Sequence, residues 1–322
     1  MTKRPALRRL LTLGAMALPL CAAGYPDKSI EWVVPYPAGG GSDVVARTLA
    51  EPMSKALGQT IVVNNKPGAA TNIGADYVAR AKADGHVMLT ADTATLAANP
   101  SLYAKLPYNA EKDFATVGLM ARFPMILVVN PAVPAKTLAE FIAWAKKQPD
   151  GVNYATPGAG SPHHLATELF RERSGLKLAH VPYRGAAPAV QDVVGGQVSF
   201  MFVDTATGYP HIQSGKLRAI GVASPKRLSS FGTIPTLAEQ GLKGFEAFAW
   251  QGLVVPAATP ADAVAALNKA MVSALSTTAV KARFQTLGLE AIPSTPAQMA
   301  AYAKAERDKW GQVIRAANIR LD

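Results

Sequence analysis

The sequence predicts an α/β fold divided into two lobes. Short β-prone segments alternate with helix-like segments over residues 30–92, and the alternation returns over residues 152–204. Such alternation is typical of mixed, mostly parallel sheets flanked by helices. A glycine-containing turn opens a helix in each half, at residues 39–41 and 158–160. About 298 residues remain after an N-terminal leader, a length that usually divides into two lobes.

The leader, residues 1–24, has the pattern of a secretory signal peptide. Its apolar run of 14 residues ends in small residues and is shorter than the ~20 residues of a membrane-spanning helix. Cleavage is expected after Ala23 or Gly24. Cys21 leaves a lipoprotein as an alternative, which the large Leu20 before it disfavours. We therefore expect a periplasmic protein exported by the general secretory route. The cations before the apolar run are Lys3, Arg4, Arg8 and Arg9.

Removing the leader takes away the only cysteine and four cations, so the formal net charge falls from +11 to +7. The mature chain then has no disulfide, no thiol nucleophile and no cysteine-based metal site. A moderate positive charge suits anionic ligands. Nucleic acid is not an expected partner, because no cluster of Lys and Arg is interleaved with aromatic residues.

The first turn follows a predicted strand at residues 30–36. The helix after it should run to Leu57 and begin at Ser42 or Asp43, because either side chain can cap the first N–H groups. Apolar residues then recur at the spacing of one helical face. Exposed N–H groups and the positive end of the helix dipole attract anions. We expect this corner to bind a carboxylate.

Two more loops should lie at the same sheet edge as this corner. A strand at residues 60–64 leads through the loop 66–72 into a helix, and a strand at 87–90 leads into the loop 90–93. Ligands of open parallel sheets bind at the carboxyl ends of the strands. These loops are therefore candidates for the floor of a binding site.

The second half begins at a compact apolar strand, which we interpret as the crossing into lobe two. A second corner follows, in which Ser161 at the N-cap and Pro162 at the first helical position predict a helix start.

The last helix, with charges on one face, should lie in lobe one. Lobe one is expected to comprise residues 25–124 and 250–322, and lobe two residues 125–249. The further expected strands are 125–129, 152–156, 178–183, 198–203, 217–223 and 248–255, and the helices are 72–83, 138–147, 187–194, 260–275 and 296–318.

Catalysis and cofactor binding are disfavoured by the spacing of the reactive side chains. His163 and His164 are consecutive, so on a helix they point about 100° apart and do not ligate one metal easily. Ser42 and Ser161 lack the Gly-x-Ser-x-Gly pattern and a third triad member. The glycines of the first turn do not fit Gly-x-Gly-x-x-Gly, and no Walker motif exists. We expect no catalytic residue, metal or cofactor.

From end to end, the mature chain resembles substrate-binding proteins of tripartite tricarboxylate transporters, the TctC or Bug family. The matching stretches are Tyr25-Pro-Asp-Lys-Ser-Ile, Val34-Pro-Tyr-Pro-Ala-Gly-Gly-Gly-Ser-Asp, Asn65-Lys-Pro-Gly-Ala-Ala-Thr-Asn-Ile-Gly-Ala, Leu106-Pro-Tyr, Lys112-Asp-Phe, Gly160-Ser-Pro-His-His-Leu, His180-Val-Pro-Tyr-Arg-Gly, Gly195-Gly-Gln-Val and Pro210-His-Ile. The resemblance implies a Venus-flytrap architecture of the type II kind. It also implies capture of a small organic anion by loop backbone and ordered water.

The resemblance also implies the residues of the site. The first cradle comprises Tyr36, Ala38, Gly39 and Gly40, backed by Ser42 and Asp43; lobe two contributes Gly160, Ser161, His164 and Asp204, and the floor of lobe one contributes Thr71, Asn72 and Thr93. Val203 stands where many relatives place an acid, which puts recognition of an amino group there in doubt. Arg184 could reach the cleft, and a structural hydrogen-bonding role is favoured for it.

The implied partners are a mono- or dicarboxylate, possibly aromatic, and the membrane permease of the transporter; a monomer is expected. The sequence leaves the ligand itself open. Two alternatives to the transport role also stay open: a secreted enzyme such as a hydrolase on a similar two-lobed frame, and a receptor that serves a sensor kinase. The expected hinge of lobe closure lies near Pro124 and Phe248.

Overall fold

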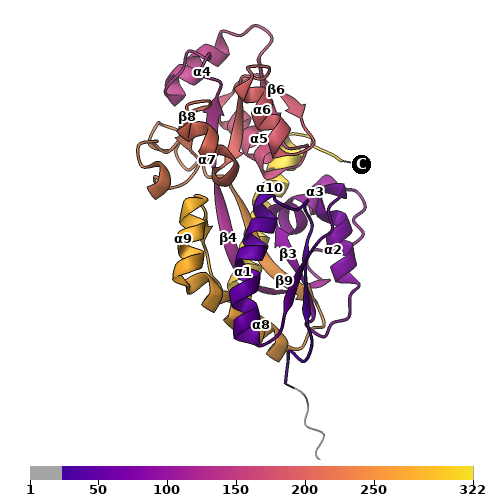
Figure 1. Cartoon of the computed structure of the whole chain (residues 1–322). Helices are drawn as coiled ribbons and strands as arrows, with labels where there is room; N and C mark the ends of the chain where they lie inside the picture. Colours follow the sequence, from indigo (N-terminus) through magenta and orange to yellow (C-terminus); the bar gives the residue numbers. More distant parts are fainter. Residues whose placement is uncertain (1–23, 322) are drawn as a thin grey trace, which may run out of the picture.

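Two β-sheets share one long strand, β4 (Phe114–Val129), in the computed structural model, which describes residues 24–321 (Figure 1). The first half of β4 belongs to a sheet with the order β2-β1-β3-β9-β4, and β10 pairs beside it. The second half belongs to a sheet with the order β4-β7-β5-β6, and β8 pairs beside it. We call these sheets, with their helices, lobe one and lobe two. The two-lobed α/β prediction is confirmed.

The strands are short except for the two that cross between the lobes, β4 and β9. Parallel pairing joins β1 with β2 and β3, and β5 with β6 and β7, whereas β4 and β9 pair antiparallel with their neighbours. The remaining strands are β1 (Ile30–Val34), β2 (Ile61–Asn65), β3 (Val87–Asp92), β5 (Val152–Thr156), β6 (Leu178–Pro182), β7 (Phe200–Asp204), β8 (Arg218–Val222), β9 (Phe248–Pro256) and β10 (Glu290–Ala291).

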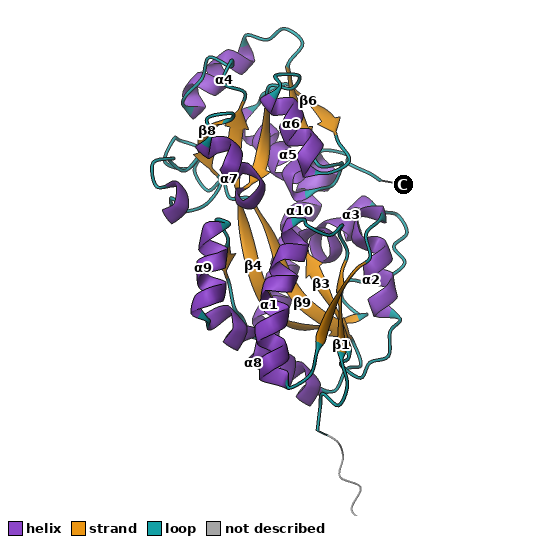
Figure 2. Cartoon of the chain, in the orientation of Figure 1, coloured by secondary structure: helices purple, strands orange, loops and turns teal. Residues whose placement is uncertain are grey.

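Helices cover both sheets (Figure 2). They are α1 (Gly41–Leu57), α2 (Asn72–Ala79), α3 (Asn99–Leu102), α4 (Leu138–Lys146), α5 (Pro162–Ser174), α6 (Ala186–Val194), α7 (Thr205–Gln213), α8 (Ala261–Ser276), α9 (Thr278–Thr286) and α10 (Pro296–Ala316), with the single turns η1 (Ala69–Thr71) and η3 (Ser229–Phe231) and the π-helix η2 (Thr93–Ala98). In the described part of the chain no single helix is long and apolar enough to cross a membrane; only α8 and α9 together pass that test, and they are bent by 68°.

The crossing strand β4 starts earlier than its sequence predicts. A strand was expected only from Met125, because Pro124 lacks a ladder N–H group and usually ends a strand. In the structure Pro124 pairs with Phe248 at the point where β4 changes sheets: residues up to Pro124 pair with β9, and residues from Met125 pair with β7 and β8. The proline therefore stands where the ladder changes partners, and the strand continues through it.

Several other elements depart from the expected pattern. Gly40, and not Ser42 or Asp43, is the N-cap of α1, and no side chain caps it. The helices α7 and α9 follow Asp204 and Thr277, whose side chains cap them, and neither helix was expected. The signal peptide predicted for residues 1–24 lies outside the described residues except for Gly24.

One apolar core runs through both lobes. Its largest cluster contains Leu89 and Trp250 from lobe one together with Tyr154 and Phe200 from lobe two, and it includes Trp310 of α10. Contacts of α10 reach η2, α3 and β4 and also α5 of lobe two. Two smaller clusters fill the other faces of the two sheets. The C-terminal helix thus packs against both lobes.

Gly118 of strand β4 is closely packed, so we expect a side chain at this position to destabilise the fold. An added Cβ would lie 2.7 Å from the Ser294 carbonyl oxygen and 2.8 Å from Asn268 Nδ2, which itself donates to that carbonyl. We expect Gly118→Ala to lower the free energy of unfolding by ~1–3 kcal/mol, the usual range for overpacking. Gly232→Ala is the matched control, because nothing lies within 4 Å of its Cβ position. Urea denaturation measures both; equal stabilities would contradict the predicted close packing.

Candidate functional site

The turn between β1 and α1 is exposed from Pro37 to Gly41. Gly39 has a φ of +82° with open space around its Cβ position, a conformation that suits glycine. Its N–H group, however, donates to Asp43 Oδ2 at 2.9 Å. The sequence predicted a free amide at Gly39, but this amide is hydrogen-bonded to Asp43 in the structure. Because α1 has no side-chain cap, the first amides of the helix remain the donors of this corner.

Asp43 holds the turn in place and is itself 3% exposed. Besides the Gly39 amide, it accepts hydrogen bonds from Arg47 Nε at 3.0 Å and Asn65 Nδ2 at 2.9 Å. Burial raises its pKa, but the hydrogen bonds from Arg47, Gly39 and Asn65 outweigh this and bring the pKa below its usual value. The carboxylate is thus charged and fully bonded, and it positions the loop.

Ser42 links this corner to the crossing strand β9. Gln251 Nε2 donates to Ser42 Oγ at 2.5 Å. Gln251 is 5% exposed, and its Oε1 atom has no hydrogen-bond partner among the described residues. Sequence reasoning missed Gln251, although a glutamine inside the apolar run 248–255 was a readable signal.

Tyr36 points its hydroxyl at Asp92, to which it donates a hydrogen bond. Asp92 Oδ1 also accepts from the Thr95 amide and hydroxyl, both at 2.9 Å, and so caps η2. Burial raises the pKa of Asp92 above its ordinary value, and burial beside Asp92 raises that of Tyr36. The Tyr36 hydroxyl is therefore used in a hydrogen bond within lobe one. In the predicted carboxylate cradle, Tyr36 can take part only through its backbone.

The predicted floor residues use their side chains within lobe one. The Oγ1 atoms of Thr71 and Thr95 are hydrogen-bonded to each other at 2.9 Å, and Asn72 Oδ1 accepts from Asn99 Nδ2 at 2.8 Å. Thr93 Oγ1 accepts from the Trp250 amide at 3.1 Å. All three predicted residues are buried. These hydrogen bonds support the loops of lobe one.

The loop before α2 has an unusual backbone. Ala69, Ala70 and Thr71 have φ values of +45°, +49° and +79°, where residues other than glycine are uncommon. Ala69 and Ala70 are exposed. Backbone strain of this kind clusters at functional sites, and this loop follows β2 at the same edge as the β1–α1 turn.

The second predicted corner forms as expected: Ser161 is the N-cap of α5, and its Oγ accepts from the His164 amide at 3.3 Å. Ser161 Oγ also donates to the Gly158 carbonyl at 2.7 Å. Gly160 is buried, and an added Cβ would meet Leu102 Cδ1 at 2.5 Å and Leu321 Cδ1 at 3.0 Å. This corner is therefore packed against α3 and the C-terminal tail.

Beneath this corner, His164 and His180 stack with ring centroids 3.9 Å apart, and Tyr154 stacks on His180 at 5.1 Å. The Gly160 amide donates to His164 Nδ1 at 3.0 Å, so that nitrogen carries no proton. Burial lowers the pKa of His164 to about 3, assisted by the neighbouring charge of His180, and burial lowers that of His180 to about 4. Both rings are neutral near pH 7.

Asp204 joins two corners of lobe two. It caps α7 through the Thr207 amide at 2.9 Å, and its Oδ2 lies 3.2 Å from His163 Nε2. Burial raises the pKa of Asp204, but the hydrogen bond and charge of His163 dominate and lower it overall. His163 Nδ1 is buried without a partner among the described residues. Sequence reasoning had set His163 aside.

The start of α1 faces the start of α7. Phe123 lies 3.2 Å from the Cβ position of Gly41, and Ala206 of α7 packs against the cluster that contains Phe123 and Tyr36. Figure 1 shows α7 above the upper end of α1. The structure thus brings Asp204 toward the first corner, whereas Gly160 and Ser161 lie beside α3. Arg184 is exposed and makes none of the hydrogen bonds proposed for it from the sequence.

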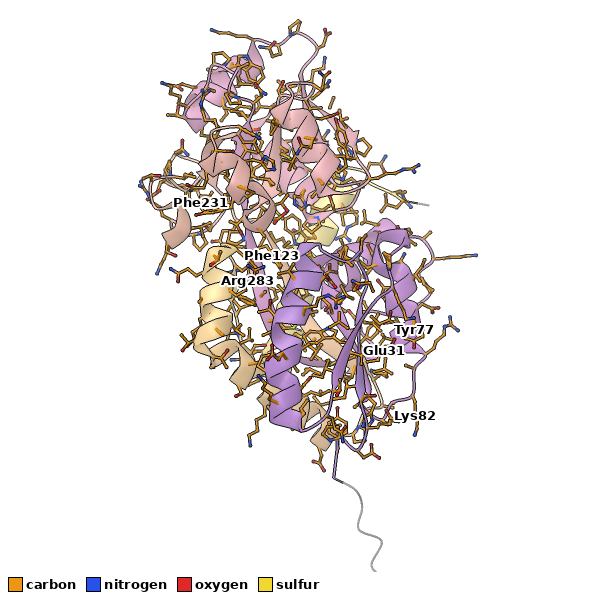
Figure 3. All side chains as sticks on the ribbon, viewed as in Figure 1. Glu31, Tyr77, Lys82, Phe123, Phe231 and Arg283 are labelled. Carbon is orange, nitrogen blue, oxygen red and sulfur yellow. The ribbon has the colours of Figure 1, made fainter. Side chains whose placement is uncertain are left out.

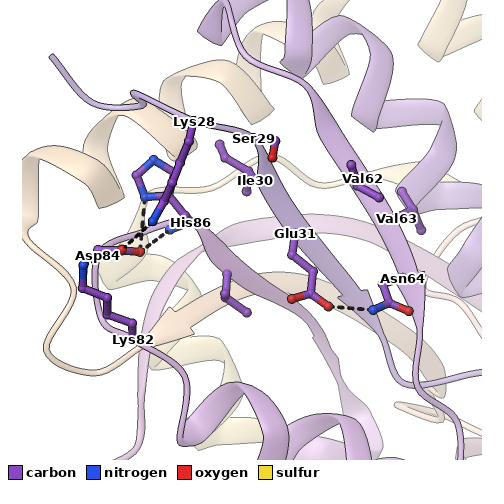
Figure 4. Close-up of a pocket in the computed structure, with 11 residues that line it drawn as sticks. Lys28, Ser29, Ile30, Glu31, Val62, Val63, Asn64, Lys82, Asp84 and His86 are labelled. Carbon is purple, nitrogen blue, oxygen red and sulfur yellow. Dashed lines mark hydrogen bonds and ion pairs between the residues drawn. The ribbon is translucent and has the colours of Figure 1, made fainter. Parts of the chain in front are cut away.

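A cavity at the far end of lobe one contains none of the predicted site residues. It measures ≈ 450 Å³ and lies at the start of β1, where Asp84 bonds Lys28 at 3.1 Å and Asn64 bonds Glu31 at 2.7 Å (Figure 4). Its charged groups are paired with one another, so it does not suit a carboxylate. In residues 24–321 no group of three or more His, Cys, Asp or Glu side chains is arranged to hold a metal ion.

The profile of the tripartite tricarboxylate transporter family receptors, TctC, matches residues 45–319. The chain belongs to this family. Among its relatives, BugT of Bordetella pertussis is 35% identical over 312 residues, 97% of this chain and 96% of BugT. The TctC profile thus covers most of both lobes and the second corner, and it begins two residues after Asp43 of the first corner.

Solved structures of TctC-like proteins have the same fold. Rpa4515 of R. palustris, solved with adipate, is 31% identical and superposes with a TM-score of 0.85 over 92% of this chain and 99% of that one. MatC of Rhodopseudomonas palustris, solved with malate, is 33% identical with a TM-score of 0.81 over 90% and 100%. The periplasmic binding protein BugD is 35% identical with a TM-score of 0.82 over 92% and 99%. This TctC family member is therefore a solute-binding protein.

The stacked histidines predict a pH-dependent stability. Their folded pKa values, about 3 and about 4, lie below the ~6.5 of an unfolded histidine. The unfolded chain therefore binds more protons than the folded chain below pH 6.5. The free energy of unfolding is highest above pH 6.5 and falls as the pH drops toward 4, by at most about 1.4 kcal/mol per pH unit for each histidine. Chemical denaturation at pH 7.0, 6.0 and 5.0 measures this fall.

A double variant isolates the two rings. His164→Asn keeps an acceptor near Nδ1, and His180→Gln keeps a polar atom near Nε2, which lies 2.6 Å from Thr156 Oγ1. We expect the double variant to lose less stability than wild type between pH 7.0 and 5.0, while His211→Gln behaves like wild type. Parallel curves for wild type and the double variant would be evidence against neutral, stacked histidines.

Proposed function

We propose that this TctC receptor is periplasmic and binds a small organic carboxylate between its lobes, at the start of α1, for a tripartite tricarboxylate permease. The observation that carries the proposal is the uncapped helix start behind an exposed glycine turn. Asp43, which accepts hydrogen bonds from Gly39, Arg47 and Asn65, keeps that turn in place. Adipate and malate in the related structures support a carboxylate as the ligand class.

The proposed site keeps most of the residues predicted from the sequence, in revised roles, and adds Gln251. The exposed backbone of Ala38, Gly39 and Gly40 and the first amides of α1 face the ligand, and Ser42 with Gln251 flanks them. Asp204 faces this corner from lobe two. Asp43, Thr71, Asn72, Thr93 and His164 position the loops through the bonds described above.

Main-chain capture is sufficient in energy. Hydrogen bonds to a charged group contribute ~1.5–3 kcal/mol each, and a partly buried helix terminus up to ~2 kcal/mol. Three or four such contacts approach the ~8 kcal/mol of micromolar affinity. No cationic side chain is required at this corner, where Arg47 is already paired with Asp43. We propose that the protein binds without chemical change and acts as a monomer.

The carboxylate proposal is tested by calorimetry with adipate and malate, after a thermal-shift screen of small mono- and dicarboxylates. Ligand at 100 times its Kd should stabilise the fold by ~2.7 kcal/mol, and mass spectrometry should recover the acid unchanged. We expect Gly39→Val to weaken binding at least tenfold, because a β-branched residue resists a φ of +82° and fills the approach.

Gly58→Val is the matched control for this substitution. Gly58 ends the same helix with a φ of +69° and open space at its Cβ position, so it carries the same backbone penalty far from the proposed cradle. Equal affinities of the two variants would remove the cradle from the β1–α1 turn. If no organic acid in the thermal-shift screen stabilises the protein, the proposal that its ligand is a carboxylate is refuted.

Lobe closure is the second consequence of this proposal. We place the hinge at Pro124 and Phe248, which pair where β4 changes sheets, and the lobes at residues 25–124 with 250–322 and at 125–249. Small-angle scattering should show a smaller radius of gyration with saturating carboxylate than without it. The variant Gly39→Val at the same ligand concentration should keep the larger value. Identical wild-type profiles in both states would refute closure.

A further inference from the structure

A second cavity, of ≈ 540 Å³, opens between the lobes beside the crossing strands. Lobe one lines it with Arg122 of β4, with one face of α9, and with the turn that leads into β10. Lobe two lines it with residues 224–229, which follow β8. Figure 1 shows α9 below the loops of lobe two, and Figure 3 labels Phe231 above Arg283, which belongs to α9.

This cavity is separate from the proposed carboxylate site. None of the site residues lines it. The two regions are joined by a hydrogen bond in which Thr205 Oγ1, next to Asp204, donates to the Gly288 carbonyl at 2.7 Å. Ala206 also packs against the apolar cluster that contains Phe284 and Leu289 of the cavity wall. Arg122 lies two residues before Pro124, so the cavity is beside the proposed hinge.

The walls carry four cations and one carboxylate, that of Glu290. Arg122 is satisfied, because it donates to Glu290 at 2.9 Å and lies over the ring of Phe248 at 4.1 Å. Arg227 of lobe two is paired with Glu239 at 2.9 Å. The positive charge left over comes from Lys226 and Lys281.

Lys226 and Lys281 stand on opposite walls, one from each lobe. Both are exposed, and within residues 24–321 neither side chain takes part in an ion pair or a hydrogen bond. Two unpaired ammonium groups that line one cavity repel each other, and a shared anion between them removes that repulsion. Other exposed lysines, such as Lys55 and Lys304, are paired with Glu51 and Asp308, whereas the unpaired Lys226 and Lys281 line one cavity from two lobes.

We propose that this cavity binds a small polyanion of the phosphate class, held between Lys226 and Lys281. Lysine binds phosphate as a point charge and does not need the planar geometry that arginine requires. The volume lies within the ~300–1,000 Å³ of small-ligand pockets. A ligand that bears two or more negative charges can contact both walls at once, and it then links the lobes beside the hinge.

Inorganic pyrophosphate tests the proposal, because it carries no carboxylate for the α1 corner. Calorimetry and ³¹P NMR titration of the whole mature chain, at ionic strength held constant with sodium chloride, should show saturable binding below about 1 mM. The double variant K226A/K281A should bind at least tenfold more weakly. The control K146A/K147A removes the same charge from α4 and should bind like wild type.

Three results would overturn the proposal. The first is the absence of saturable pyrophosphate binding by the wild-type protein. The second is equal affinity of K226A/K281A and K146A/K147A for pyrophosphate. Gly39→Val separates this site from the carboxylate site, because it should keep full pyrophosphate affinity. The third is loss of pyrophosphate binding in Gly39→Val but not in K226A/K281A, because pyrophosphate would then bind at the proposed carboxylate site and not in this cavity.

Discussion

The antiparallel ladder between β4 and β9 is the constraint on which the two-lobed structure depends. It runs from Phe114 paired with Pro256 to Pro124 paired with Phe248, and beyond Pro124 the same strand becomes the centre of lobe two. Because the backbone groups of a buried strand must all be bonded, neither lobe can shift along this ladder without breaking it. Rotation is left only where the ladder changes partners, and there the proline has no N–H group to lose.

Within this frame, three buried aspartates hold the loops of the proposed site. Asp43, Asp92 and Asp204 each accept at least one backbone amide hydrogen bond at the start of a helix or in the turn before it. The charge of Asp43 is balanced by Arg47, and that of Asp204 is stabilised by His163. In the proposed site, these acids fix the main chain, and the remaining amides of α1 receive the negative charge of the ligand.

The sequence predicted most of the fold because its elements carry local signals. The strand 152–156 and the Ser161–Pro162 helix start lie where turn chemistry and capping placed them. The first part of β4 was missed because a proline usually ends a strand. The helices α7 and α9 were missed although Asp204 and Thr277 are N-cap residues that the sequence displays, because each helix directly follows a strand or another helix. The ligand contacts stay a prediction. The roles of Tyr36 and Gly160 needed the structure, since their partners Asp92 and Leu102 lie more than fifty residues away in sequence or in the other lobe.

Contacts between the lobes outside the crossing strands include both apolar packing and single hydrogen bonds. The largest apolar cluster contains residues of both lobes, and α10 packs against α5 of lobe two. At the edges, Gly160 packs against Leu102 and Leu321, and Thr205 donates a hydrogen bond to the Gly288 carbonyl. A single such bond contributes only ~0.5–1.5 kcal/mol net, whereas the ladder of β4 and β9 contributes many. The proposed closure therefore has to keep the ladder and the shared apolar cluster, and the hydrogen bond of Thr205 is the kind of contact that it can exchange.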